Sequence, residues 1–180
     1  MKKQGCAWVL SRMVIEMISH PTMLQPFTIT TWVEEINKFF TSRCFAIRNE
    51  AGEAIGYCRT LWAAIDLETR KPTDLSLLLN NLGSFIVDEP CPIEKPGKIQ
   101  AAERDTPGIP YKVRYSDLDV NGHFNSIKYM EHLLNMFDIE MFRHKEVSRF
   151  EIAYMAEGKY GMELSLHKKE ITPDRYITSI

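Results

Sequence analysis

The sequence predicts an α+β fold in which an antiparallel sheet wraps around one long helix. In both halves of the chain, apolar and polar residues alternate with the period of two that strands require. One segment near the middle of the second half repeats apolar residues at steps of three and four, as a helix does. A short repeat also relates the two halves. A strand, a long helix and several antiparallel strands in this order are typical of the α+β class.

Four strands are predicted in the first part of the chain, over 6–17, 25–36, 39–49 and 54–66. In the first of them, Met13, Ile15 and Met17 share one face, because successive side chains of a strand point to opposite sides. A hairpin turn is expected at Asn49–Gly52, since Asn and Gly are favoured in tight turns.

A linker is predicted over 76–110. This segment is expected to begin with a short apolar helix at Leu75–Phe85, and a proline-rich stretch comes after the helix. Proline lacks the backbone N–H and disfavours a helical residue before it, so this stretch is expected to be extended.

The last part is predicted to contain a strand over 111–116, a loop over 117–123, a helix over 125–143, and strands over 147–157 and 163–171. Asn125 or Ser126 is a suitable N-cap for the helix. Its apolar stripe is expected to be buried against one face of a sheet and consists of Ile127, Met130, Leu134, Phe137 and Met141.

The repeat predicts two tandem units. Residues 10–17 read LSRMVIEM and residues 147–154 read VSRFEIAY, which match at a constant offset of 137 residues. We expect 1–75 to be a partial first unit without its N-terminal strand and helix, and 111–180 to be a partial second unit without its last strands. The complete protein would then have about 240 residues, with each unit the size of a small domain. The alternative is a divergent protein that folds as it stands.

Composition narrows the functional class. The net charge of −2 and a sequence pI near 6.2 argue against nucleic acid as a partner. No apolar run is long enough to span a bilayer, so no membrane partner is expected, and the cytoplasm is the predicted location. The four cysteines, Cys6, Cys44, Cys58 and Cys91, lack metal-ligand spacing and are expected to be reduced and buried. No phosphate-binding or serine-hydrolase motif is present, and no cofactor or metal is predicted.

The densest polar cluster runs from Ser116 to Asn125. If this segment is extended, Asp117, Asp119, Asn121 and His123 share one side, while Leu118 and Val120 point into the core. A carboxylate beside an imidazole fixes its tautomer and can support acid–base chemistry. The alternative is a turn that only leads into the helix.

The run YKVRYSDLDVNGHFNSIKYMEHLLNMF resembles the signature of the acyl-ACP thioesterases, which reads close to W-S-D-L-D-V-N-x-H-V-N-N-x-K-Y. The segments AWVLSRMVIEM and LWAAIDLETRKP resemble the first-repeat strands of the same family. The resemblance covers nearly the whole chain in the same order. It implies a double hot-dog fold, with two tandem units that each wrap a sheet around a helix.

The resemblance also implies the catalytic residues. The family's aspartate, asparagine and histidine fall on Asp119, Asn121 and His123, and a later glutamate falls on Glu157. The residue after that glutamate is a cysteine in the plant enzymes and Gly158 here, so a cysteine nucleophile is not expected at that position.

The implied reaction is hydrolysis of the thioester between a fatty acyl chain and acyl carrier protein in fatty acid biosynthesis. Glu157 would be the general base on a water, or a direct nucleophile. His123 would polarise the reacting groups, Asn121 would position them, and Asp119 would hold both in place. Amides near Phe124–Ser126, at the start of the helix, would take up oxyanion charge.

Acidic carrier protein is the expected partner, and its docking residues are predicted among Arg143, His144, Lys145 and Arg149, or Lys168 and Lys169. A homodimer is also considered. The alternatives to this function are a hot-dog acyl-CoA thioesterase and an inactive acyl-binding remnant.

Overall fold

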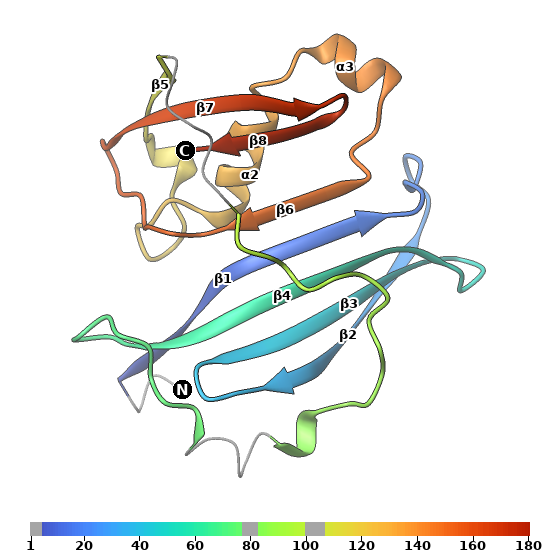
Figure 1. Ribbon diagram of the computed structural model, residues 1–180, viewed down its shortest axis with the longest axis vertical. Coiled ribbons are helices and arrows are strands. Elements are labelled where there is room, and N and C mark those ends of the chain that lie inside the picture. Colours follow the sequence, from blue (N-terminus) through green and yellow to red (C-terminus); the bar gives the residue numbers. More distant parts are fainter. Residues whose placement is uncertain (1–4, 77–82, 100–106) are drawn as a thin grey trace. The chain divides into compact units, whose positions relative to one another are not determined.

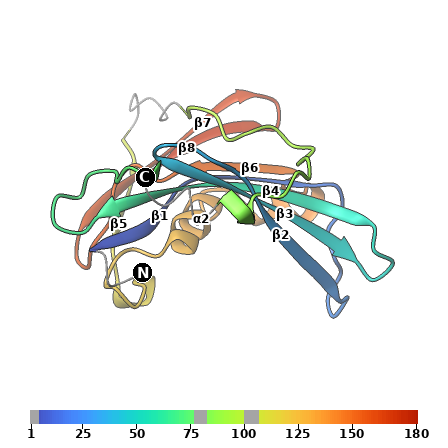
Figure 2. The same cartoon turned by 90° about the horizontal axis from the view of Figure 1, so that it is seen from below.

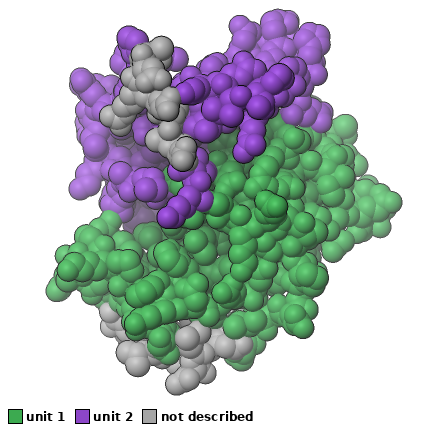
Figure 3. Space-filling view, viewed as in Figure 1, with its two compact units in different colours: residues 1–97, 147–153 green, residues 98–146, 154–180 purple. Residues whose placement is uncertain are grey.

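The computed structural model describes residues 5–76, 83–99 and 107–180. Its residues form two compact units, coloured separately in Figure 3. The first contains residues 1–97 and 147–153, and the second contains residues 98–146 and 154–180. The predicted repeat boundaries are not tested by this division, which follows spatial contacts and not sequence equivalence.

The first unit is built on a five-stranded antiparallel sheet with the order β2-β3-β4-β1-β6 (Figure 1). Its strands are β1 (Cys6–Met17), β2 (Phe27–Ile36), β3 (Phe40–Asn49), β4 (Ala54–Asp66) and β6 (Arg149–Ala153). The four strands predicted in the first part of the chain are confirmed within two residues at each end. Figure 2 shows how the neighbouring strands twist relative to one another, as strands of L-residues do.

The hairpin between β3 and β4 turns where it was predicted. The Gly52 amide donates to the Asn49 carbonyl at 2.9 Å, and Gly52 has a φ of +81°, a conformation that glycine adopts without steric cost.

One face of this sheet is covered by the extended segment that follows β4. Its Cys91 and Ile93 pack in a cluster with Val14, Trp32, Cys44, Ala46 and Tyr57. The buried Arg59 ties this segment down by donating to the carbonyls of Ile93 (2.6 Å) and Cys91 (3.1 Å). The Arg59 guanidinium also forms an ion pair with the Glu34 carboxylate, at 2.6 Å. The described part of the proline-rich stretch at 90–97 therefore contains no helix, in line with the prediction, and Cys91 and Ile93 place it in the core of this unit.

The two copies of the predicted repeat lie side by side as strands β1 and β6. They pair antiparallel from Arg12 opposite Ala153 to Glu16 opposite Arg149. Val14 and Glu151, which the repeat offset makes equivalent, lie opposite each other. A local two-fold relation therefore passes through this pair of residues, as expected when equivalent strands of two repeats pair.

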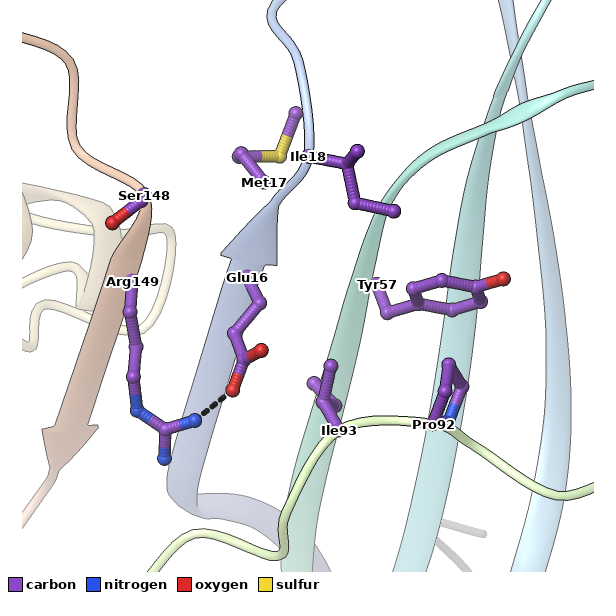
Figure 4. A pocket seen from close by; sticks show the side chains of 8 residues that line it. All are labelled: Glu16, Met17, Ile18, Tyr57, Pro92, Ile93, Ser148 and Arg149. Carbon is purple, nitrogen blue, oxygen red and sulfur yellow. Dashed lines mark hydrogen bonds and ion pairs between the residues drawn. The ribbon is translucent and has the colours of Figure 1, made fainter.

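A pocket of about 380 Å³ opens on the same unit, beside the pairing of β1 and β6 (Figure 4). Its lining includes Tyr57 and Ile93, and the ion pair between Arg149 and Glu16 crosses it. None of the predicted catalytic residues lines this pocket.

The second unit contains a three-stranded antiparallel sheet with the order β5-β7-β8. Its elements are β5 (Ile109–Lys112), the 3-10 turn η3 (Tyr115–Asp117), helices α2 (Ser126–Leu134) and α3 (Ile139–His144), and strands β7 (Glu163–Thr172) and β8 (Arg175–Ser179). Strand β7 is confirmed. The strand predicted at 111–116 overlaps β5 only at 111–112, because β5 begins at Ile109 and a 3-10 turn follows it. The strand predicted at 147–157 is too long. Strand β8 was missed, although Pro173 and Asp174 are turn residues.

The prediction of one helix over 125–143 is wrong. The helix ends at Leu134, and Asp138 begins a second helix by accepting a hydrogen bond from the Glu140 amide at 2.8 Å. The predicted stripe is also wrong at Ile127, which is 66% exposed, whereas Leu133 is buried. Asp138 favours a cap over a helix interior because its carboxylate bonds the free amides of a helix start.

The predicted linker helix at Leu75–Phe85 lies largely outside the described residues. At the end of this range, the described residues form the 3-10 turn η2 (Gly83–Phe85). Within the described part of the chain, no helix combines the length and the apolarity needed to cross a membrane.

Candidate active site

The loop that carries Asp119, Asn121 and His123 is a closed turn. The Asp119 carboxylate accepts hydrogen bonds from the backbone amides of Asn121 (2.8 Å) and His123 (3.0 Å). The Asp119 amide in turn donates to the His123 carbonyl at 2.8 Å. Gly122 completes the turn with a φ of +78°. Asp119 therefore holds the backbone on which both other residues stand.

The turn overturns the predicted alternation along an extended segment. Val120 does not point into the core but is fully exposed, and Asn121 is exposed as well. The physical reason is local, because an aspartate that bonds amides two and four residues ahead curls the chain and removes the period of two.

The bonds of this turn also set the charge of Asp119. Partial burial raises the pKa of its carboxyl, but the amides of His123 and Asn121 and the nearby imidazole lower it more, so the pKa lies below its usual value. Asp119 is therefore ionised at neutral pH and acts as an acceptor.

His123 and Glu157 face each other although 34 positions separate them in the sequence. The imidazole Nε2 lies 3.7 Å from a Glu157 carboxylate oxygen, and both side chains are about one third exposed, at 36% and 38%. An isolated β-bridge between His123 and Lys159 aligns the two segments, and the Phe124 amide donates to the Gly158 carbonyl at 2.8 Å. A substrate can reach this pair, since neither side chain is buried.

Gly158 permits the close approach of these segments. A Cβ atom at this position would lie 2.8 Å from the Cβ of Phe124 and 3.1 Å from the Tyr129 hydroxyl. Contacts under 3.0 Å require one of the atoms to move, and here one is attached directly to the backbone.

The predicted oxyanion donors are partly wrong. The Phe124 amide is bonded to the Gly158 carbonyl, and the Asn125 amide to the Asp117 carbonyl at 2.8 Å. Asn125 is the N-cap of α2, and its side chain accepts from the Ile127 amide at 2.9 Å. These amides are engaged within the fold and are not available to a substrate oxygen.

Asp117 belongs to a buried network behind the loop and not to its exposed side. Its carboxylate accepts from the Tyr111 hydroxyl (2.6 Å) and the Arg114 amide (2.7 Å) and lies 3.3 Å from the His132 imidazole. The His132 ring stacks on Phe124 with centroids 5.6 Å apart. Sequence reasoning missed Tyr111 and His132, because neither has a local pattern that marks a polar partner.

The cysteines and the polar groups of the described residues give no sign of other chemistry. None of the four cysteines forms a disulfide. Cys44, Cys58 and Cys91 are buried as predicted, whereas Cys6 is only partly buried. Burial raises the pKa of the Cys44 and Cys58 thiols to about 12, which disfavours the reactive thiolate. In the part of the chain that the structure describes, no cluster of His, Cys, Asp and Glu has the composition to hold a metal ion.

The arrangement defines a thioesterase-like hot-dog protein, and solved structures agree. An acyl-ACP thioesterase from Bacteroides thetaiotaomicron is 42% identical and superposes with a TM-score of 0.90 over 97% of this chain and 70% of its own. The 12:0-ACP thioesterase from Umbellularia californica shares the fold at 22% identity, with a TM-score of 0.80 over 93% of this chain and 66% of its own. The predicted hot-dog α+β class is confirmed.

Family profiles and curated relatives give the particular family. The acyl-ACP thioesterase N-terminal domain matches residues 1–77, and the acyl-ACP thioesterase C-terminal domain matches residues 100–179. The chain therefore belongs to the acyl-ACP thioesterase family. A chloroplastic acyl-acyl carrier protein hydrolase of Cuphea viscosissima is 29% identical over 87% of this chain. The chain spans 39% of that relative's length.

Proposed function

We propose that this protein hydrolyses the thioester of a fatty acyl chain on acyl carrier protein, releasing the free fatty acid. The observation that carries the proposal is the exposed pair of His123 and Glu157, 3.7 Å apart and held by the Asp119 turn. Membership of the acyl-ACP thioesterase family supports the substrate.

In the proposed mechanism Glu157 is the general base. It takes a proton from water as the water oxygen attacks the thioester carbonyl carbon. His123 polarises the reacting groups. As the C–S bond breaks, the proton that Glu157 has taken passes by way of the His123 imidazole to the departing thiolate sulfur, so both side chains regain their starting state. The products are a carboxylic acid and the thiol of the carrier's phosphopantetheine arm. Asn121 positions the water or the carbonyl, and Asp119 keeps Asn121 and His123 in register.

Four of the six basic residues predicted for carrier docking already have partners on their own surface. Arg143 is paired with Glu140, Lys145 with Asp174 and Arg149 with Glu16. Lys168 donates to the Met136 carbonyl at 2.6 Å and lies over the Phe137 ring. Docking through these residues would require exchange of such exposed pairs, which are individually weak. Carrier docking there stays part of the proposal.

A cytoplasmic location and a homodimer complete the proposal. The four cysteines form no disulfide, which supports a reducing compartment, where thiols persist. Light scattering would establish whether two copies pair.

The first test is fatty-acid release from a panel of acyl-ACP substrates, with acyl-CoA thioesters in parallel, by this chain and by Glu157→Gln. The variant keeps the shape of the side chain but cannot accept the proton, so we expect a loss of about 100-fold or more in kcat. Glu163→Gln, on β7, is the matched control and is expected to be unchanged. Full activity of Glu157→Gln would overturn the mechanism, and a preference for acyl-CoA would overturn the substrate.

A further inference from the structure

Tyr129 contacts the peptide backbone on both sides of Glu157. Its hydroxyl donates to the Ala156 carbonyl at 3.2 Å and accepts from the Gly158 amide at 2.9 Å. One oxygen on helix α2 thus holds the residue before and the residue after the proposed base. With its neighbours fixed, the Cα of Glu157 has little freedom to shift relative to α2.

The Tyr129 ring is itself held in place by aromatic neighbours. Phe124, the residue after His123, meets it edge-on with centroids 4.3 Å apart, and Tyr154 does so at 5.8 Å. The Tyr154 hydroxyl in turn donates to the Ser126 carbonyl at the start of α2 at 3.1 Å. The same side chain therefore touches the segment of His123 by its ring and the segment of Glu157 by its hydroxyl.

The hydroxyl stays protonated across the physiological range. Burial raises the pKa of Tyr129, the bond from the Gly158 amide opposes this, and the charge of Glu157 raises it further. A neutral phenol can donate to Ala156 and accept from Gly158 at the same time, which a phenolate cannot do.

We propose that Tyr129 is a positioning residue for the proposed reaction, which fixes the Glu157 carboxylate at working distance from His123. The inference rests on the proposed function and goes beyond it, because Tyr129 touches neither the substrate nor the reacting atoms. A rigid support matters here, since a displacement of about 1 Å at a catalytic group can cost 100-fold in rate.

The test is a double-mutant cycle on acyl-ACP hydrolysis with Tyr129→Phe and Glu157→Gln. Tyr129→Phe removes one oxygen and leaves the ring, so we expect kcat to fall about 10- to 100-fold with KM changed less than about twofold. In the Glu157→Gln background the same change should cost less than about twofold, because the hydroxyl that it removes holds the backbone on both sides of Glu157. Tyr115→Phe, which removes the hydroxyl of a tyrosine that is 85% exposed, is the matched control and should remain near full activity.

Losses that multiply in the double variant, or an equal loss in Tyr115→Phe, would show a merely structural role and overturn the proposal. Full activity of Glu157→Gln would instead overturn the proposed base, so the two failures are distinguishable.

If the chain shows no hydrolysis at all, NMR tests the positioning role. Glu157→Gln should shift the His123 ring signals in the parent chain and leave them unshifted in Tyr129→Phe. An equal shift in both would refute it.

Discussion

Two aspartates that lie close together in the sequence have different structural roles. Asp119 organises an exposed turn by accepting two backbone amides, whereas Asp117, two positions earlier, is 3% exposed and bonds Tyr111, Arg114 and His132. Both aspartates were predicted from the sequence to lie on the same side of an extended segment, and the structure shows that this prediction is wrong. Alternation marks which residues share a face of an extended strand, but it carries no information once the chain curls.

At this scale we predict that Asp117 makes stability depend on acid pH. Burial raises the pKa of its carboxyl, but the bonds from Tyr111, Arg114 and His132 lower it more, so the folded pKa lies below the unfolded one. Its contribution is therefore present above the unfolded value of about 3.9 and is lost as the pH falls through the folded pKa. Asp117→Asn should lower the unfolding free energy at pH 7 by about 1–3 kcal/mol and flatten its decline below about pH 5.

Urea unfolding at a series of pH values measures this effect. Glu68→Gln, which changes an exposed carboxylate, serves as the control and should follow the parent curve. A variant Asp117→Asn whose curve keeps the same slope in acid would contradict the assignment.

At the scale of elements, strands were easier to predict than helices. Strands β1 to β4 follow from alternation, and their register is set by which face is buried. The helix was overextended because Phe137 and Met141 continue the apolar spacing across a break. Asp138 indicates the break, because a capping residue inside a run of helical periodicity marks the start of a new helix.

The meeting of two short segments, 123–124 and 157–159, predicts a steric requirement at Gly158. Gly158→Ala places a Cβ 2.8 Å from the Cβ of Phe124 and should push the segments apart. We expect kcat for acyl-ACP hydrolysis to fall about tenfold or more, because the spacing of His123 and Glu157 widens. Gly97→Ala is the control, since its Cβ would meet only Glu151 at 3.7 Å, an ordinary contact. Unchanged kcat in Gly158→Ala would show that the backbone yields without cost to the site.

At the scale of the whole chain, sequence order and spatial order diverge. Strand β6 follows α3 in the sequence but pairs with β1 in the sheet of the first unit. The chain therefore passes between the two compact units three times, and the first unit is incomplete without residues 147–153.

A core change on β6 is accordingly predicted to destabilise the first unit. Ile152 is buried, at 6% exposure, so Ile152→Ala should lower the unfolding free energy by about 2–5 kcal/mol. Trp8, Trp32 and Trp62 all lie in the first unit, so urea unfolding followed by tryptophan fluorescence reports it directly. Val120→Ala, at a fully exposed position, should shift the transition by less than about 0.5 kcal/mol. Equal transitions in the two variants would mean that β6 contributes nothing to this unit.

The sequence by itself determined the strands of the first sheet, the α+β class and the motif that carries Asp119, Asn121 and His123, because periodicity, turn chemistry and motif spelling are local properties. The catalytic roles of these residues and of Glu157 stay predictions. Only the tertiary structure decided that β1 pairs with β6, that Asp117 is buried on His132, and that Tyr129 holds both neighbours of Glu157. These contacts join residues 15 to 141 positions apart, and no local pattern encodes which distant partner a buried polar group or an unpaired strand edge will find.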